Sequence, residues 1–345
     1  MNAVRIFTII TAYHVLFSHK CSQKLFETIP SRLGRVRDMV LGFIVRHSPL
    51  LLQRLVIQLC PPSWLVSLSK YTGTYDGYCI TPCVLSLSSD IVVQYGIGIT
   101  SSRAAMQEYA YKRVDQAVVR IPKVYRFFMY RSANRSCSYG YLFMEYMKGK
   151  TVLELDEATE NNEASTALTK QISGIAVHLL SIKAPDGTPP GPVNGAPPDG
   201  YLWGDDGSDT AFASAADWNT WLNRRLKIIN KSIDISPYYP LVICHGDFVR
   251  RNIIVLDDNK DSKTNRNYSY EGRQLALVDW GFAALLPRMC EFASMFSYND
   301  EGGYQYTLNL LLATKDEIGG LTQEEEECFK LLVSARAMCL RYTRL

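Results

Sequence analysis

Three polar residues in the C-terminal half have the types and spacing needed for chemistry. Asp247 and Asn252 are five residues apart in the segment HGDFVRRN, and Asp279 ends the next predicted strand, in LVDWG. A carboxylate can accept the proton of an attacking hydroxyl, and carboxylate and amide oxygens are ligands that Mg²⁺ prefers. The pattern therefore indicates phosphoryl transfer from a nucleotide, with Asp247 as base and Asn252 and Asp279 as metal ligands.

The composition is that of a globular protein with one large or two small domains. The 345 residues are 47% hydrophobic and 21% charged, which excludes fibrous and wholly disordered classes. The net charge is +3, but residues 1–70 hold nine Lys and Arg against two acids, a net +7 that leaves −4 for the rest. Because no DNA- or RNA-binding motif accompanies this basic region, we do not expect a nucleic-acid partner.

The nine cysteines are scattered, without a CxxC pair or a matching His spacing. Neither a zinc site nor a disulfide framework is expected, even for the closest pair, Cys79 and Cys83. Reduced cysteines favour an intracellular protein, and we expect a cytoplasmic location. The apolar residues 6–17 resemble the core of a signal peptide but lack a small-residue cleavage site.

Residues 1–70 are predicted to form a basic helical extension. Ser48-Pro49 favours the start of a helix, since proline is common at the first helical position. The basic side chains on these helices suggest a weak contact with a membrane surface. A helical extension packed on the main domain, with its basic face in water, explains the same pattern.

Residues 71–147 are predicted to form a small sheet with one helix. Short β-branched runs at 80–87 and 91–93 indicate strands, as does the aromatic and apolar run at 141–146. The helix is predicted over residues 100–114.

Residues 148–345 are predicted to form a mainly helical lobe that carries the catalytic loop. Its Pro- and Gly-rich stretch 184–204 is a long loop, and loops of that length are often functional. Strands are predicted at 253–256 and 275–278, and a final helix at 321–345.

These segments, in this order, resemble the aminoglycoside phosphotransferase and choline kinase-like family, and especially its fungal members. The likeness runs from about residue 71 to 296 and includes IPKVY, YLFMEY and DGYLWG, which start at residues 121, 141 and 199. It implies an α+β fold of the bilobal protein kinase type, with a small antiparallel-sheet N-lobe and a mainly helical C-lobe. It also implies ATP and Mg²⁺ between the lobes, with adenine held by the backbone of Glu145 to Met147.

Two positions depart from the family pattern. Gln94 stands where active members carry a phosphate-binding lysine, and Arg103 stands where they carry its glutamate partner. In one reading, Arg103 supplies the cation from the helix and Gln94 is its neutral counterpart, so that nucleotide binding survives. In the other, the chain is a kinase-like pseudoenzyme that acts as a nucleotide-binding or scaffold protein.

The resemblance implies that the acceptor is a hydroxyl group of a small molecule. Asp205, Asp206 and Asp209 could form an acidic surface for an aminoglycoside, but a solvated loop explains them equally well. Gly73 and Gly77 lie where a phosphate loop would be, although an ordinary turn fits them as well.

Overall fold

The computed structural model describes residues 31–72, 82–131, 137–158, 166–257, 272–298 and 304–342. The apolar segment 6–17 and the turn containing Gly73 and Gly77 lie outside these ranges. The chain divides into two compact units, Met1–Tyr75 and Asp76–Leu345.

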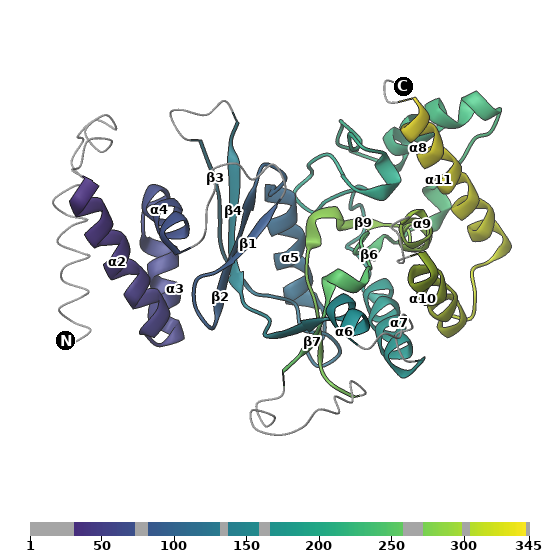
Figure 1. Ribbon diagram of the computed structural model, residues 1–345. Coiled ribbons are helices and arrows are strands. Elements are labelled where there is room, and N and C mark those ends of the chain that lie inside the picture. The colour runs from purple at the N-terminus through teal and green to yellow at the C-terminus, as the bar shows by residue number, and fades with distance from the viewer. Residues whose placement is uncertain are drawn as a thin grey trace. The chain divides into compact units, whose positions relative to one another are not determined.

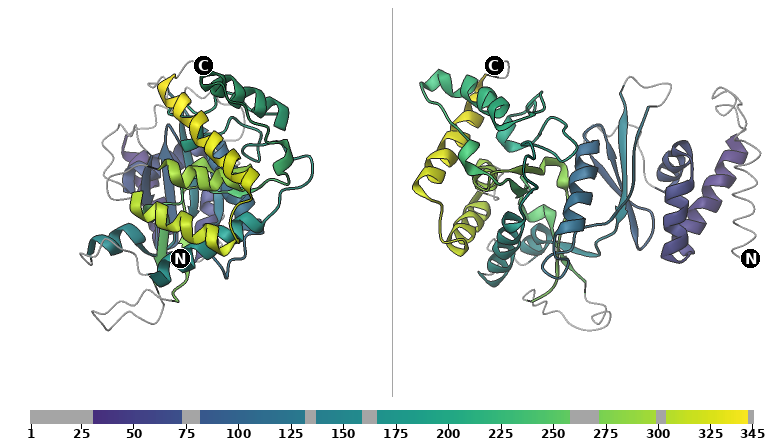
Figure 2. Two further views of the ribbon diagram at one scale, coloured as in Figure 1. Left: turned by 90° about the vertical axis from the view of Figure 1, so that its right-hand side faces the viewer. Right: turned by 180° about the vertical axis from the view of Figure 1, so that it is seen from behind.

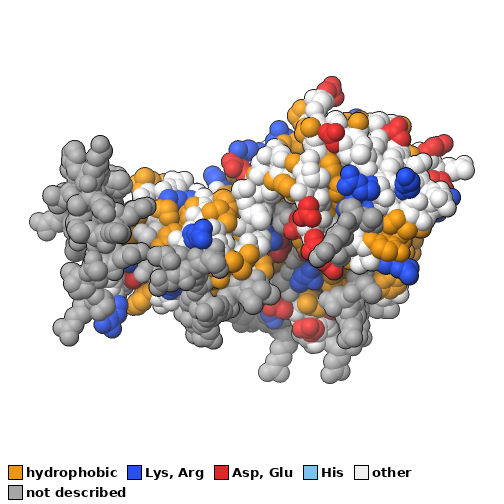
Figure 3. All heavy atoms as spheres, turned by 90° about the horizontal axis from the view of Figure 1, so that it is seen from above, with side chains coloured by type: hydrophobic (Ala, Val, Ile, Leu, Met, Phe, Trp, Pro, Cys, Tyr) orange, Lys and Arg blue, Asp and Glu red, His pale blue; other side chains and the backbone are white. Residues whose placement is uncertain are grey.

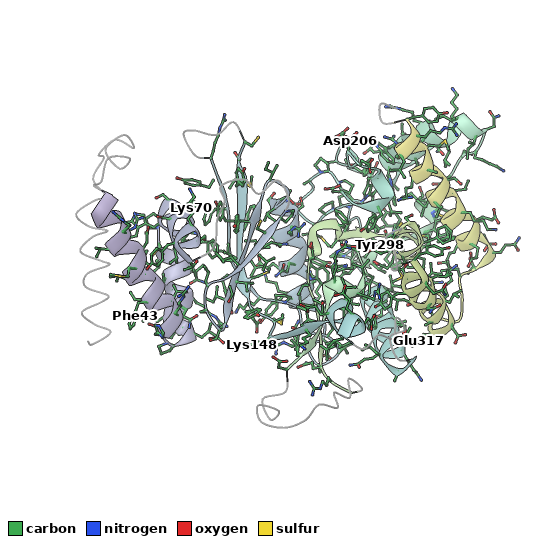
Figure 4. The ribbon with its side chains drawn as sticks, viewed as in Figure 1. Phe43, Lys70, Lys148, Asp206, Tyr298 and Glu317 are labelled. Atoms are coloured by element: carbon green, nitrogen blue, oxygen red, sulfur yellow. The ribbon has the colours of Figure 1, made fainter. Side chains whose placement is uncertain are left out.

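The first unit contains the helices α2 (Ser31–His47), α3 (Leu50–Leu59) and α4 (Pro62–Thr72) (Figure 1). Helix α2 packs against both of the others, around the buried side chains of Val45, Ile57 and Leu65. The opposite face of α2 exposes four apolar residues at helical spacing, which we call the α2 stripe: Val36, Met39, Val40 and Phe43, with 49 to 65% of each residue exposed. Phe43 is labelled in Figure 4.

The second unit begins with a four-stranded antiparallel sheet. Its strands are β1 (Cys83–Ser86), β2 (Ile91–Gly96), β3 (Val124–Tyr130) and β4 (Tyr139–Glu145), in the spatial order β1-β2-β4-β3. The β-branched and aromatic residues of β2 and β4 are buried almost throughout, as expected for central strands.

Helix α5 (Ser101–Arg113) covers one face of this sheet (Figures 1 and 2). The Thr100 side chain caps its N-terminus by accepting the Arg103 N–H. The buried Gln107 amide donates to the carbonyl of Pro122 (2.8 Å) and to the sulfur of Met144 (3.3 Å). These contacts tie the helix to the strands beneath it.

The rest of the second unit is mainly helical and is built around the buried rings of Trp218, Phe248, Trp280 and Phe292. Its helices are α6 (Val152–Ala158), α7 (Thr166–Ser181), α8 (Ala215–Leu226), α9 (Met289–Ser297), α10 (Tyr304–Glu317) and α11 (Gln323–Arg341). A three-stranded antiparallel sheet has the order β5 (Gly149–Thr151), β7 (Ile253–Leu256), β8 (Leu275–Leu277). A two-stranded antiparallel sheet pairs β6 (Val242–Cys244) with β9 (Ala284–Leu286). The 3₁₀ turns are η2 (Tyr201–Trp203), η3 (Lys227–Ile229), η4 (Ser236–Tyr238), η5 (Arg250–Asn252) and η6 (Trp280–Phe282).

A sheet lobe followed by a helical lobe is the bilobal α+β architecture that the sequence predicts, and this prediction is confirmed. Within the described ranges, no helix combines the length and the hydropathy needed to cross a bilayer.

The prediction that the chain carries no disulfide is wrong at Cys83, which is disulfide-bonded to a partner outside the described residues. The spacing of cysteines along a chain does not show which of them the fold brings together. Cys244, Cys290, Cys328 and Cys339 are free thiols in the core, and burial raises the pKa of Cys244 and of Cys290 well above the ordinary value.

Candidate active site

The turn η5 and the start of β7 bring Asp247 and Asn252 together. The Asn252 side-chain N–H groups donate to the Asp247 carboxylate (2.8 Å) and to its main-chain carbonyl (3.0 Å). Both residues are buried, with 6% and 4% of their surface exposed. Because the amide nitrogen makes both bonds, the amide oxygen of Asn252 stays available to a cation.

His245 braces this loop. The Asp247 N–H donates to Nδ1 of His245 (3.3 Å), and Nε2 lies 3.1 Å from the carbonyl oxygen of Val278. Since Nδ1 accepts, the proton must be on Nε2, which donates to Val278. Complete burial lowers the pKa of His245, which favours this neutral form.

A buried carboxyl group lies beneath the loop. Glu291 of α9 accepts hydrogen bonds from the backbone N–H groups of His245 (2.6 Å) and Gly246 (3.2 Å). Burial raises the pKa of Glu291 from 4.5 to about 7. Gly246 has a φ of 75°, and a Cβ atom there would lie 2.6 Å from the carbonyl oxygen of Phe282, so this position requires glycine.

Asp279 lies beside this pair. The preceding residue, Val278, donates its N–H to the main-chain oxygen of Asn252 (2.9 Å), which joins the two loops. Asp279 itself has a left-handed backbone (φ 64°, ψ 71°), an uncommon conformation for a non-glycine residue. Its carboxylate accepts the N–H of Gly281 (3.4 Å).

The guanidinium of Arg103 forms an ion pair with the Asp279 carboxylate, which joins α5 to the turn η6. The Arg103 side chain is only 7% exposed, and its Nε has no hydrogen-bond partner among the described residues. A Cβ atom on residue 281 would lie 2.2 Å from Nη2 of Arg103. A side chain at position 281 would therefore require the Arg103 guanidinium to move.

The remaining predicted residues lie on β2 and at the end of β4. Gln94 is 5% exposed at the centre of the sheet, and its amide hydrogen-bonds no residue in the described part of the chain. The Glu145 carboxylate is engaged by Arg120 (2.7 Å) and by the N–H of Lys123 (3.2 Å). The Met147 N–H forms no backbone hydrogen bond with the described residues, so this donor is available where adenine is expected.

Three further side chains, none of them a predicted site residue, surround Asp247. Arg251 donates to the Asp247 carboxylate (3.3 Å), to the hydroxyl of Tyr201 (3.3 Å) and to the hydroxyl of Tyr298 (2.9 Å). The ring of Tyr201 packs edge-on against the rings of Tyr298 and Phe282. Burial, followed by the Asp247 charge, raises the pKa of Tyr201. Arg251 lies inside the HGDFVRRN motif and Tyr201 inside the DGYLWG segment, whereas no motif in the sequence pointed to Tyr298.

The acidic residues Asp205, Asp206 and Asp209 line a different cavity of about 400 Å³. Arg224 and Arg225 of α8 line it as well. Asp206 and Tyr298 are labelled well apart in Figure 4, so these acids are separate from the site around Asp247. From above, acidic and basic side chains are interspersed over the surface of the helical lobe (Figure 3).

Within the described ranges, no three His, Cys, Asp or Glu side chains group into a metal cage. The site offers instead two carboxylates and one amide oxygen. Such a partial set suits Mg²⁺, which is usually bound by one or two carboxylates together with substrate phosphates and waters.

The comparisons with known proteins assign the family. Residues 98–321 match the model of the phosphotransferase enzyme family, which is well over half of the chain. The chain therefore belongs to this family. A search of curated proteins finds no match.

Two solved structures that match this chain are distant from it in sequence. One is a thermostable mutant of aminoglycoside phosphotransferase APH(4)-Ia in ternary complex with AMP-PNP and hygromycin B, at 14% identity, covering 81% of this chain and 91% of that chain, with a TM-score of 0.44. Another is the GDP complex of wild-type aminoglycoside 2'-phosphotransferase-IIIa, at 14% identity, covering 78% and 85% of the two chains, also with a TM-score of 0.44.

Proposed function

We propose that this protein transfers the γ-phosphate of ATP to a hydroxyl group of a small molecule, in a Mg²⁺-dependent reaction. The observation that carries the proposal is the hydrogen-bonded pair of Asp247 and Asn252 beside Asp279, in a chain of the phosphotransferase family. In this proposal, Asp247 orients the acceptor hydroxyl and takes its proton.

The side-chain oxygen atoms of Asn252 and Asp279 are suitable ligands for a divalent ion. Asn252 has an uncommitted amide oxygen, and Asp279 is the more exposed carboxylate, with 33% of its side chain accessible. We therefore assign Asn252 and Asp279 as the residues that would hold Mg²⁺. When bound, the ion would neutralise phosphate charge.

We propose that Arg103 is the cation that takes over from the missing lysine. It is buried, it lies against Asp279, and its Nε lacks a partner among the described residues, so it can take an additional acceptor such as a phosphate oxygen. Gln94 and Met147 complete the proposed nucleotide site, with Gln94 as a neutral residue on β2, while the backbone of Glu145 and Met147 contacts adenine.

Replacing Arg103 tests this assignment directly. Arg103→Gln is expected to weaken ATP binding, titrated without metal, by roughly 10- to 100-fold, the value of one charge-assisted contact. The matched control is Arg224→Gln, which removes an exposed arginine from the separate cavity. Equal affinities for the Arg103 variant and the parent would contradict the role of Arg103.

One observation favours the pseudoenzyme alternative. The Arg103 ion pair engages the carboxylate that would bind the metal, and the strand position that is expected to hold phosphate is neutral. Such a site could bind a nucleotide without turnover.

Thermal unfolding with ATP and Mg²⁺, each alone and together, tests the function, together with an assay for ADP. The enzyme predicts cooperative stabilisation by the pair and ADP formation that Asp247→Ala abolishes. Stabilisation without turnover supports the nucleotide-binding pseudoenzyme, and no response to either ligand supports a scaffold.

Three further predictions from the sequence stay proposals. They are the likeness to fungal members, the cytoplasmic location, and a weak membrane contact through residues 1–70. The α2 stripe, with Arg46 and His47 in the last turn of the same helix, supports the membrane contact, since apolar and basic residues on one helix suit an anionic bilayer surface.

A further inference from the structure

The wall beside Asp247 is cationic and aromatic. The Arg251 side chain, which pairs with the Asp247 carboxylate at 3.3 Å, is 44% exposed, whereas the Asp247 side chain is 7% exposed. Among the described residues, Asp247 is the one carboxylate that contacts Arg251. The hydroxyls of Tyr201 and Tyr298 fix the position of the guanidinium.

This wall belongs to the helical lobe, and the Tyr201 ring packs edge-on against Phe282 of the turn η6, which begins directly after Asp279. Arg103 and Asp279 join the loop to α5 of the sheet lobe. Tyr201 and Tyr298 belong to η2 and to the end of α9, which pack together in the helical lobe. An acceptor whose hydroxyl reaches Asp247 therefore meets Arg251 and the ring of Tyr201, which lie beside that carboxylate.

The charge of this wall selects the class of acceptor. An exposed guanidinium attracts carboxylates and repels ammonium groups, and aromatic rings favour a planar apolar body. The acids that would attract a polyamine line the separate cavity instead. We propose that the acceptor is an aromatic hydroxy acid, with its carboxylate paired to Arg251 and its hydroxyl directed at Asp247. This proposal rests on the phosphotransferase function above.

The step balances without a further reactant. The acceptor oxygen attacks the γ-phosphorus, and an O–P bond forms as the bond to the β–γ bridging oxygen breaks. The hydroxyl proton passes to Asp247, and ADP leaves. The product is a phosphate ester that keeps its carboxylate on Arg251.

Three probes of nearly equal shape test the charge preference. Mandelate, 1-phenyl-1,2-ethanediol and 2-amino-1-phenylethanol share a phenyl ring and a benzylic hydroxyl but carry a negative, zero and positive charge. Calorimetric titration of the full chain is expected to show mandelate binding roughly 10- to 100-fold more tightly than the amine. Kanamycin, a polycation, is expected to bind no better than the amine.

Variants assign the preference to Arg251. Arg251→Gln is expected to abolish the preference for mandelate, Arg251→Lys to keep part of it, and Arg224→Gln to leave it intact. Thermal unfolding of each variant establishes that it is folded. Equal or tighter binding of the amine, a preference that survives in Arg251→Gln, or binding of none of the three probes would each overturn the proposal.

Measurements on the same samples distinguish a wrong acceptor class from a wrong phosphotransferase function. If ATP and Mg²⁺ stabilise the protein while mandelate is not preferred, the acceptor class is wrong and the phosphotransferase stands. If mandelate is preferred while ATP and Mg²⁺ have no effect, the anion site stands and phosphoryl transfer is wrong.

Discussion

Glu291 is the residue whose protonation most directly affects the loop of Asp247. Its carboxyl group accepts two backbone N–H groups of that loop and is fully buried. Its folded-state pKa of about 7 lies above its ordinary value of 4.5, so the folded protein binds this proton more tightly than the unfolded chain does. Stability from this group is therefore complete below pH 4.5 and is lost as the pH rises to about 7.

The change Glu291→Gln is expected to remove this pH dependence. A shift of this size corresponds to roughly 3 kcal/mol between pH 5 and pH 8, which the variant, lacking the titrating group, should not lose. Urea unfolding at pH 5 and pH 8 measures this change in the free energy of unfolding. Glu157→Gln, at an exposed position, serves as the control and should behave like the parent. An identical loss in Glu291→Gln and parent would show that other groups are responsible.

The sequence predicts some residues of the site better than others. Asp247 and Asn252 are near neighbours in the chain, so one short motif was enough to pair them. Arg251 meets Tyr201 and Tyr298 across about 50 residues in each direction, and only the folded helical lobe brings the three together. The contact of Arg103 with Asp279 spans 176 residues and was not predictable for the same reason.

At the scale of elements, α5 and the turn η6 are joined through one ion pair and one glycine. Gly281→Ala would place a methyl group on the Arg103 guanidinium and displace it from Asp279. We expect a loss of about 1–3 kcal/mol in the free energy of unfolding, as for other overpacked sites. Chemical denaturation measures the change.

A matched substitution and a double variant make this test specific. Gly98 lies near the start of α5, where the nearest heavy atom to an added Cβ is 3.8 Å away. Gly98→Ala should therefore change the free energy of unfolding little. In an Arg103→Ala background, Gly281→Ala should also cost little, because the obstructing group is gone. A full additional loss there would mean that the clash is not with Arg103.

At the scale of the whole molecule, the order of the motifs was enough to predict a sheet lobe followed by a helical lobe. The disulfide of Cys83 was missed because sulfur pairing depends on the folded path of the chain. The basic charge of residues 1–70 was visible, but the α2 stripe emerges only when the packing of α2 against α3 and α4 shows which face stays exposed.

The α2 stripe gives the membrane proposal a measurable form. Phe43→Glu is expected to lower the fraction of protein that sediments with phosphatidylserine vesicles by up to about tenfold, because a large apolar side chain is lost from the contact. Val84→Glu, at a similarly exposed apolar position on β1, is the control. Equal sedimentation of both variants and the parent would exclude contact through this face.

Helix α5 is attached at two points one turn apart. Gln107 fastens it to Pro122 and Met144 of the sheet lobe, and Arg103 fastens it to Asp279. The helix therefore cannot rotate or slide on the sheet without breaking buried hydrogen bonds. Any tilting of the sheet would therefore either move the Asp279 turn with it or break the Arg103 contact.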